Sequence, residues 1–399
     1  MKDRYILAIN EGDYGSTGLI AESILNGAKS LGLKPLFGVF EKTKNNDFTI
    51  SLSSNRFNNF ANRLLCRIDG SDGFHNIKAT RDFLNSISNL DIAIIHLHNI
   101  HGRYVNLELI FQFAREKNAK IVWTLHDCWM FTGRCAHFEL ADCFRWRELC
   151  GKCPTRCEYP ASYFCDKSKK YLEKKTVLYK KYEDLITVVC PSNWLHNYLV
   201  QSKVGFLKSK VIHNGIERIE GAAEGDDKID FKNKKVFISV AAGFDKRKGF
   251  EYINKLADEL DPDKFVFIVA GMPPSKHKEI SKHILNLGYV NDRQKLNYYY
   301  SISDALINPT LEDTFPTINL EALSQGIPVI TFDTGGSPEC LNSSCGIVVQ
   351  KGSYSKLKNT VETFKKGLFS RENCIKQSEL FSKKNMCSEY MNLFKEILK

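Results

Sequence analysis

The stretch "INPTLEDTFPTINLEALSQGIPVITFDTGG", residues 307–336, has apolar runs near both ends and acidic residues between them. The apolar runs predict two strands, and the residues between them predict a loop followed by a helix. Pro316 fixes its own φ and disfavours helical backbone at Phe315, so the helix begins at or after Pro316. We therefore expect Asp313 on the loop and Glu321 inside the helix.

Asp313 and Glu321 lie on either side of the start of this expected helix. The N–H groups of a first helical turn lack intrahelical partners and bind anions such as phosphate. Carboxylates accept hydrogen bonds from hydroxyl groups. The arrangement therefore indicates a ligand with both phosphate and hydroxyl groups, such as a phosphorylated sugar.

Similar apolar runs alternate with helix-length segments along the whole chain, which is typical of parallel α/β domains. Residues 217–235 interrupt the alternation with a charged, aperiodic segment and are predicted to be a linker. The expected helices include residues 17–31, 105–117 and 193–201. The expected strands are "YILAIN", "KPLFGVF", "DIAIIHLH", "KIVWTLH", "LITVVCPS" and "KVIHNG" before the linker, and "VFISVAA", "FVFIVAG", "NLGYV", "ALINPT", "PVITFD" and "GIVVQ" after it.

The chain therefore predicts two doubly wound parallel-sheet domains, residues 1–216 and 236–380, the first with a Cys-rich insertion at about residues 128–165. Residues 381–399 have apolar positions at helical spacing and are expected to pack back on the first domain. In open α/β sheets, ligands bind beyond the carboxyl ends of the strands. We therefore looked for functional residues in the loops that follow the strands.

The loop after the first expected strand, "NEGDYGSTGLIAESIL", is rich in glycine. Gly12, Gly15 and Gly18 permit a tight turn, and Ser16 or Thr17 is expected to cap the following helix, whose N–H groups then face an anion. A plain strand-to-helix turn explains the pattern equally well.

The first strand of the second domain is followed by a compact cationic loop, "AAGFDKRKGF". Lys246, Arg247 and Lys248 can neutralise a diphosphate, and the forked donors of arginine suit phosphate oxygens. The alternative is a solvated lysine-rich turn. A further loop, "FDTGGSPEC", contains Gly335 and Gly336, which allow close backbone approach to a ligand or simply form a tight turn.

A histidine and an aspartate follow a first-domain strand in "TLHDCWMFTGRC". His126 and Asp127 should lie at the carboxyl edge beside Trp129 and Phe131. A group that titrates near neutral pH between aromatic walls suits sugar binding. A satisfied core histidine is the alternative.

Seven of the thirteen cysteines fall between residues 128 and 165. Cys135, Cys143, Cys150 and Cys153, with gaps of seven, six and two residues, are candidate ligands of a structural zinc that holds an insertion without its own core. Cys157, Cys128 or His137 is an alternative ligand, and a set of reduced buried thiols is the alternative interpretation.

The net charge of +10 is concentrated in the segment 167–181, "KSKKYLEKKTVLYKK". This segment is either a solvated helix face or a contact with an anionic membrane surface or a lipid-phosphate acceptor. We find no nucleic-acid motif beside it. No apolar run reaches the roughly 18 residues of a membrane span, and the N-terminus enters a strand directly, so we expect a cytoplasmic protein.

Together these motifs resemble glycosyltransferase family 4, whose retaining enzymes have the GT-B fold of two Rossmann-like domains facing across a cleft. The resemblance covers essentially the whole chain and is strongest in "KGF", in residues 307–336 and in "EYMNLFKEIL". "DIAIIHLHNIHGRYVNLELI", "IVWTLHDCWMFTGRC" and "VVCPSNWL" resemble the subgroup that builds colanic acid, capsule and O-antigen repeat units.

The resemblance implies that the first domain binds the acceptor and the second binds a nucleotide-sugar donor. By position, Glu321 matches the glutamate that holds the ribose, and Asp313 or its neighbour Glu312 matches the one that contacts the donor sugar. Gly243 stands where the family has an arginine, and Arg247 is its expected replacement. The other matched positions are Lys248 for the diphosphate, Thr314, Phe315 and Pro316 for the sugar and diphosphate, His126 near the donor sugar, and Gly15 and Ser16 at the diphosphate.

The implied reaction transfers a sugar with retention to a lipid-linked oligosaccharide, on the inner face of the plasma membrane and in surface polysaccharide biosynthesis. His126, Asp313 and Lys248 are the implied catalytic residues, and no catalytic metal is expected. UDP-hexose is the first expectation for the donor, and GDP-mannose or GDP-fucose is the second. One alternative is a GT-B protein that binds partners without catalysis. Another, suggested by the charge and the cysteines, is a zinc-containing nucleic-acid binder.

Overall fold

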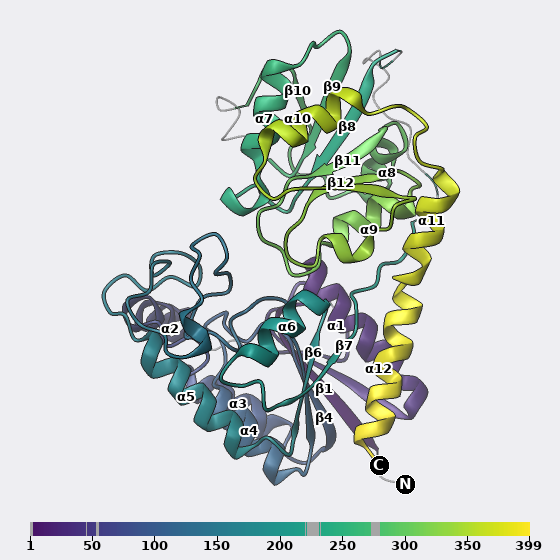
Figure 1. The fold of residues 1–399 in the computed structure, drawn as a ribbon. Helices are drawn as coiled ribbons and strands as arrows, with labels where there is room; N and C mark the ends of the chain where they lie inside the picture. The colour runs from purple at the N-terminus through teal and green to yellow at the C-terminus, as the bar shows by residue number, and fades with distance from the viewer. Residues whose placement is uncertain are drawn as a thin grey trace. The chain divides into compact units, whose positions relative to one another are not determined.

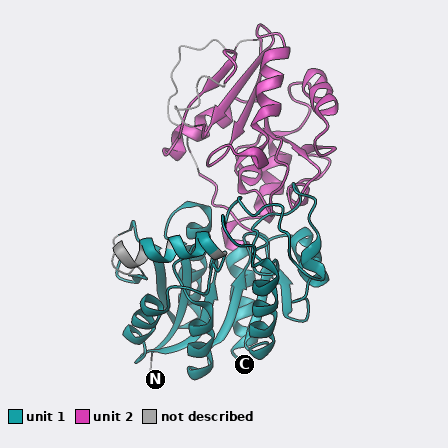
Figure 2. Cartoon of the chain, turned by 90° about the vertical axis from the view of Figure 1, so that its left-hand side faces the viewer, with its two compact units in different colours: residues 1–213, 386–399 teal, residues 214–385 magenta. Residues whose placement is uncertain are grey.

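The computed structural model describes residues 3–44, 46–52, 56–219, 221, 231, 233–272 and 280–399. The chain forms two compact units: unit 1 comprises residues 1–213 and 386–399, and unit 2 comprises residues 214–385 (Figure 2). The predicted linker, residues 217–235, lies mostly outside the described residues.

Unit 1 contains a parallel sheet of seven strands in the order β3-β2-β1-β4-β5-β6-β7 (Figure 1). Six of these strands were predicted, and the seventh, β3, was missed because its three residues are too few to show a periodicity. The strands are β1 (Arg4–Gly12), β2 (Leu33–Glu41), β3 (Thr49–Ser51), β4 (Asp91–Leu97), β5 (Lys120–Thr124), β6 (Ile186–Cys190) and β7 (Lys208–Val211).

Helices cover both faces of this sheet, because alternate side chains of each strand point to opposite faces. Leu7 and Ile9 of β1 belong to one apolar cluster, with α3, α4, α5 and α6, whereas Ile6 and Ala8 belong to a second, with α1 and α12. The helices are α1 (Gly15–Ala28), α2 (Arg56–Asp69), α3 (Ile77–Ser86), α4 (Leu107–Glu116), α5 (Ser168–Lys181), α6 (Asn193–Gln201) and α12 (Lys383–Ile397), with the 3-10 helices η1 (Lys29–Leu31) and η2 (Arg145–Arg147).

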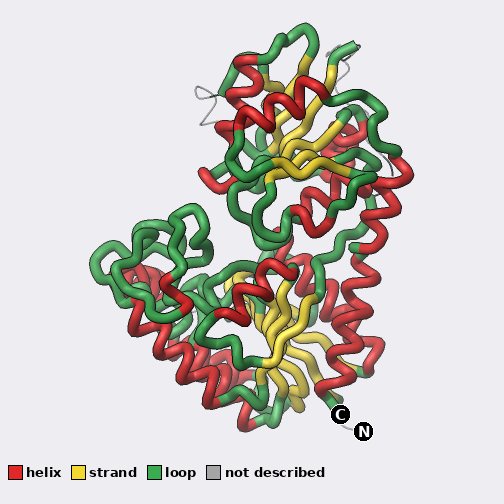
Figure 3. Tube along the Cα trace, viewed as in Figure 1, coloured by secondary structure: helices red, strands yellow, loops and turns green. Residues whose placement is uncertain are grey.

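Unit 2 contains a parallel sheet of six strands in the order β10-β9-β8-β11-β12-β13, again between helices (Figure 3). Its two cores lie on opposite faces, one under α7 and α10 and the other under α8, α9 and α11. The elements are β8 (Lys235–Val240), β9 (Phe265–Ala270), β10 (Ile284–Asn286), β11 (Ala305–Asn308), β12 (Val329–Phe332), β13 (Gly346–Val349), α7 (Phe250–Glu259), α8 (Arg293–Ser301), α9 (Thr317–Ser324), α10 (Tyr354–Thr363), α11 (Arg371–Leu380), η3 (Lys246–Lys248) and η5 (Pro338–Cys340).

Three local predictions can be compared with these elements. The helix expected at or after Pro316 is confirmed, since Pro316 is the extended N-cap of α9. The strand predicted at "NLGYV" is wrong: β10 ends at Asn286, and Gly288 adopts φ +65° in the loop beyond it. α1 begins at Gly15 rather than at residue 17, and tightens into η1 at its end.

Candidate functional site

The cationic turn after β8 is organised by an acidic residue that the sequence analysis missed. Asp245 is the N-cap of η3, and its Oδ1 accepts a hydrogen bond from the Lys248 backbone N–H at 3.2 Å. Its Oδ2 lies 3.1 Å from Nη2 of Arg247. The side chain of Asp245 therefore fixes both the turn and one of its cations.

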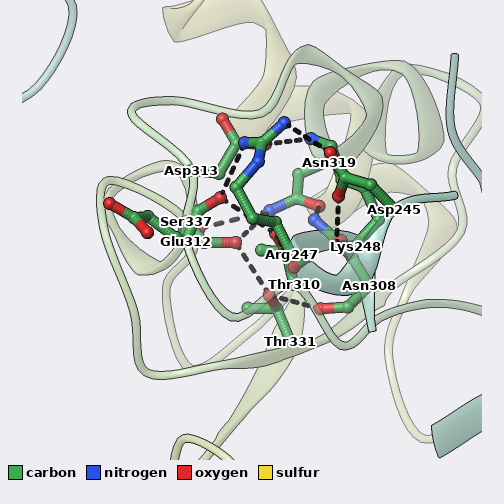
Figure 4. A network of polar contacts seen from close by, with 10 residues as sticks. All are labelled: Asp245, Arg247, Lys248, Asn308, Thr310, Glu312, Asp313, Asn319, Thr331 and Ser337. Atoms are coloured by element: carbon green, nitrogen blue, oxygen red, sulfur yellow. Dashed lines mark hydrogen bonds and ion pairs between the residues drawn. The ribbon is translucent and has the colours of Figure 1, made fainter. Parts of the chain in front are cut away.

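The turn is joined to the acidic loop that follows β11 (Figure 4). The backbone N–H of Leu311 donates to the carbonyl of Arg247 at 2.6 Å, and Nη1 of Arg247 donates to the carbonyl of Glu312 at 3.3 Å. Nζ of Lys248 lies 2.6 Å from Oδ2 of Asp313. The structure thus brings four predicted residues, Arg247, Lys248, Glu312 and Asp313, into one network.

The two acidic residues of the loop differ in accessibility. Glu312 is buried, at 1% exposure, whereas the side chains of Asp313 and Lys248 keep 15% and 22% of their surface exposed. A ligand can therefore reach the Lys248–Asp313 ion pair more readily than it can reach Glu312. Of the two candidates for the sugar contact, the geometry favours Asp313.

Two glycines permit the close approach of the loops around this network. Gly335 has φ +58°, and a Cβ there would lie 1.7 Å from the carbonyl oxygen of Asp313. Gly249 has φ +65°, and a Cβ there would lie 2.1 Å from the carbonyl oxygen of Pro309. Both positions require glycine for conformation and for space.

Helix α9 is held to the strand ends by buried side-chain hydrogen bonds (Figure 4). Nδ2 of Asn308 donates to Oδ1 of Asn319 at 2.9 Å, and Nδ2 of Asn319 donates to Oγ of Ser337 at 3.0 Å. Oγ1 of Thr331 lies 2.7 Å from the same Ser337 Oγ. These bonds connect β11, β12 and the loop after β12 to the first turns of α9.

Glu321 lies on α9 apart from the Lys248 network and has its own partners. The hydroxyl of Tyr300 donates to Oε2 of Glu321 at 3.5 Å. Burial raises the pKa of Glu321, and the positive charge of Arg293 and the Tyr300 bond oppose that rise. The carboxylate of Glu321 therefore has polar neighbours and can still accept hydrogen bonds from a ligand.

At the strand ends of unit 1, His126 follows β5 and His98 follows β4. Nδ1 of His98 and Nε2 of His126 are 3.0 Å apart. Burial lowers the pKa of His126 to about 4 and that of His98 well below its ordinary value. Both rings are therefore neutral near pH 7, with one donating to the other.

Asp127 pairs with a histidine that the sequence analysis did not single out. Oδ2 of Asp127 lies 2.6 Å from Nε2 of His101, whose Nδ1 lies 3.1 Å from the hydroxyl of Tyr159. Burial alone would raise the pKa of Asp127, but the charge and hydrogen bond of His101 lower it to about 2. The pKa of His101 is raised, because Asp127 outweighs the effect of burial. His126, Asp127 and His101 line one small pocket.

The predicted residues of the N-terminal loop are at the start of α1. Gly15, with φ +67°, and Ser16 are exposed first residues of the helix. The prediction that Ser16 or Thr17 caps the helix is wrong, because the N-cap is Tyr14 and it makes no side-chain cap bond.

Gly243, where the resemblance predicts an arginine, has φ +112°. This conformation is rarely adopted by residues with side chains, so the local backbone accounts for the departure from the family pattern. Arg247, the expected replacement, has a guanidinium group already bonded to Asp245 and to the Glu312 carbonyl.

The Cys-rich insertion differs from the expectation of a segment without a core. Phe138 and Trp146 are buried, with ring centroids 4.9 Å apart, and Trp194 and Tyr198 of α6 pack against Phe138. All thirteen cysteines are free thiols, and the described residues include no group of three or more His, Cys, Asp or Glu side chains arranged to hold a metal ion. A structural zinc on Cys135, Cys143, Cys150 and Cys153 stays a prediction.

The neighbouring thiols nevertheless affect one another. Burial raises the pKa of Cys135 to about 12, and Cys153, Cys150 and Cys143 contribute to that rise. Burial also raises the pKa of Cys150 to about 11. The two thiols are therefore protonated at neutral pH.

Two parallel-sheet Rossmann-like units with this topology define a GT-B fold. Two solved structures match it over almost their full length. Sucrose-phosphate synthase from Thermosynechococcus elongatus has a TM-score of 0.69 and 14% identity, with 99% of each chain covered. Anabaena Alr3699/HepE in complex with UDP has a TM-score of 0.64 and 13% identity, with 99% of this chain and 100% of that chain covered. The predicted fold class is confirmed.

Sequence comparisons find similarity to glycosyltransferases. Residues 223–381 match the family described as "Glycosyl transferases group 1". The chain is 26% identical over 325 residues, 76% of each sequence, to the "Putative colanic acid biosynthesis glycosyl transferase WcaC" of Escherichia coli (strain K12). It is 23% identical over 319 residues, 76% of this chain and 78% of the other, to an "Uncharacterized 41.2 kDa protein in cps region" of Klebsiella pneumoniae. The comparisons thus find glycosyltransferase similarity over the second half of the chain, in agreement with the resemblance that the sequence motifs indicated.

Proposed function

We propose that the protein transfers a hexose from a nucleoside-diphosphate donor, with retention, to a lipid-linked oligosaccharide in surface polysaccharide biosynthesis. The observation that carries the proposal is the accessible Lys248–Asp313 ion pair, held by a rigid turn at the strand ends of unit 2. The cationic turn and the acidic loop together offer positive charge to a diphosphate and an acceptor to sugar hydroxyls.

In this proposal the ion pair opens when the donor binds. Lys248 then bonds the diphosphate, and Asp313 is released to accept hydrogen bonds from the sugar. Arg247 and the N-terminal dipole of α9, preceded by Thr314, Phe315 and Pro316, add positive potential. Once the pair has opened, these groups face the diphosphate and stabilise the charge that develops on it as it leaves.

The bond between the anomeric carbon and the diphosphate oxygen then breaks, and the acceptor hydroxyl forms a new bond to that carbon on the same face. The hydroxyl proton passes to the departing diphosphate oxygen. Glu321 holds the ribose hydroxyls, with Tyr300 and Arg293 keeping its carboxylate in place. His126, with its neutral ring held by His98, is assigned to the donor sugar, and Gly15 and Ser16 to the diphosphate.

UDP-hexose is the first choice of donor, and GDP-mannose or GDP-fucose is the second. The UDP complex of HepE, which has a similar fold, supports this order. The two relatives, one named for colanic acid biosynthesis and one for a cps region, support a role in polysaccharide biosynthesis. None of the helices in the described part of the chain has the length and apolar character of a membrane span, and we propose that the protein acts peripherally at the inner face of the plasma membrane.

A thermal-shift panel with UDP, GDP, CDP and ADP tests donor binding. A nucleotide at a hundred times its dissociation constant stabilises a protein by about 2.7 kcal/mol, so one diphosphate should shift the unfolding temperature clearly. Incubation of the matching nucleotide sugar with lipid-linked acceptor and NMR of the product then tests transfer and retention. Silence with all four diphosphates would instead favour a GT-B protein that binds partners without catalysis.

A further inference from the structure

Large apolar side chains are exposed together on one part of unit 1. On α2, Phe60, Leu64 and Leu65 are 67%, 48% and 46% exposed. In the Cys-rich insertion, Tyr163 and Phe164 are 50% and 73% exposed. We call these five residues the α2 patch. Scattered exposed apolar residues are normal, but a contiguous group marks an interaction surface.

The two parts of the patch are joined by hydrogen bonds. The backbone N–H of Tyr163 donates to the carbonyl of Arg67 at 2.7 Å, and that of Cys165 donates to the carbonyl of Ile68 at 3.1 Å. Figure 1 shows α2 beside the loops of the insertion. Tyr163 and Phe164 are therefore fixed at the C-terminal end of α2.

The opposite side of α2 is the one attached to unit 1. Cys66 is fully buried, and Nδ2 of Asn62 donates to Oδ1 of Asn76 at 2.8 Å. Phe60 and Leu64 are four residues apart and so share a helix face, about half a turn away from Cys66. The exposed face is thus the outer side of a docked helix.

Positive charge flanks the patch. Arg67 is exposed near the C-terminal end of α2, and its carbonyl accepts the hydrogen bond from the Tyr163 backbone N–H. Lys169 and Lys170, shortly after Phe164 in the chain, are also exposed. Exposed apolar side chains beside exposed cations are the composition of an interfacial surface.

The basic segment 167–181, the expected membrane contact, has a different character. It contains the whole of α5, whose Tyr171, Leu172, Leu178 and Tyr179 are buried in unit 1. The interpretation of this segment as an interfacial helix needs these apolar residues at the surface, but they are buried and stabilise the fold. Helix α5 therefore offers lysines to a membrane, but of its large apolar side chains only Val177 is exposed.

We propose that the α2 patch, with Arg67, Lys169 and Lys170, docks the protein on the surface of an anionic lipid bilayer. The proposal rests on the proposed function, because a lipid-linked acceptor has to be reached at a membrane. Apolar side chains enter the headgroup region while the cations bind acidic headgroups. A second copy of the chain is a poorer occupant, since a symmetric pairing would bring Arg67, Lys169 and Lys170 of the two copies together.

Co-sedimentation of the full chain with vesicles tests this proposal. The vesicles are phosphatidylcholine with and without phosphatidylglycerol. We expect binding to the anionic vesicles, weakened about tenfold by Leu64→Ser with Phe164→Ser, and weakened also by Arg67→Glu or added salt. Val177→Ser, which removes a 70% exposed apolar residue of α5, is the matched control and should bind normally.

Two further measurements keep the outcomes distinct. Equal vesicle binding by the Leu64→Ser, Phe164→Ser variant and the control would overturn the proposal, as would a wild-type protein that does not bind. A dimer abolished by the same variant in sedimentation velocity, without vesicle binding, would identify a second copy as the occupant. The nucleotide thermal shift of each variant shows whether a failure concerns the patch alone or the proposed function.

Discussion

The strand ends of the two units carry charge in different ways. In unit 2, Lys248 and Asp313 form a partly exposed ion pair on the outside of two loops. In unit 1, His98 and His126 are neutral, and His101 and Asp127 form a more deeply buried pair, with side-chain exposures of 5% and 14%. The two carboxylates are about equally accessible, and the pairs differ in their cations, Lys248 at 22% and His101 at 5% exposure. A pair with a partly exposed cation can exchange its partner for a ligand at low cost, whereas a pair with a buried cation is a fixed part of the fold.

The strongest test of this comparison is Lys248→Ala. If the exposed pair is exchanged for the diphosphate, transfer should fall by about 10²- to 10³-fold, because a charge that stabilises the leaving group is lost. Steady-state transfer rates and the thermal shift with the donor diphosphate measure the effect. Lys264→Ala removes a cation that is 74% exposed and directly precedes β9, outside the cationic turn, and should change little.

The unfolding temperature of Lys248→Ala should stay close to that of the wild type, because partly exposed ion pairs contribute little to stability. Full transfer activity in this variant would show that the pair is structural, and the contrast between the two units would disappear.

The second test is Asp127→Asn in unit 1. Breaking a buried ion pair leaves His101 without its counter-ion, and we expect the free energy of unfolding to fall by about 3 kcal/mol. Denaturant unfolding of the two proteins measures this difference. A loss of transfer without a loss of stability would contradict the fixed role of the pair.

The pH dependence of that difference follows from the two pKa shifts. The lowered pKa of Asp127, about 2, gives stability that is present above its unfolded value near 3.8 and is lost toward pH 2. The raised pKa of His101 gives stability that is present below its unfolded value of 6.5 and is lost as the pH rises through the folded value. The stability difference should therefore be largest between about pH 4 and 6.5.

The third test is Glu321→Gln. It sharpens the comparison because this carboxylate is held by a hydrogen bond from Tyr300 and not by an ion pair of either kind. Loss of a charged acceptor for the ribose should weaken binding of the donor diphosphate about tenfold, which calorimetry measures. Since burial raises the pKa of Glu321, its ionised form is disfavoured in the fold, and the variant should be slightly more stable than the wild type at neutral pH. Unchanged affinity would remove Glu321 from the proposed site.

Much of the fold could be predicted, because strand and helix periodicities are local. The start of α9 followed from Pro316 alone. β3 was missed because three residues give no pattern, and β10 was displaced by apolar residues that lie in the loop beyond it. The core of the insertion was missed because its aromatic side chains pack against Trp194 and Tyr198, far along the chain.

The candidate site was predictable where it consists of neighbours in sequence at strand ends, as in the turn of Arg247 and Lys248. Its supporting contacts were not, because Asp245, Tyr300 and Asn319 meet their partners only through folding. His98 and His101 were within reach of the same strand-end rule, since they follow β4 beside the strand that precedes His126.

The smallest expected effect concerns the support of the site. Thr331→Val keeps the shape of a buried side chain but removes the hydroxyl that donates to the Asn308 carbonyl at 2.9 Å and lies 2.7 Å from Ser337 Oγ. The free energy of unfolding should fall by about 1 to 2 kcal/mol, because buried polar groups lose a partner. Ser324→Ala, which removes a hydroxyl bonded within α9 at 2.7 Å, is the control for a local bond. If the network positions α9 for the donor, Thr331→Val should also weaken nucleotide binding, whereas Ser324→Ala should not. Equal nucleotide affinities of the two variants would mean that the Lys248–Asp313 pair does not depend on this support.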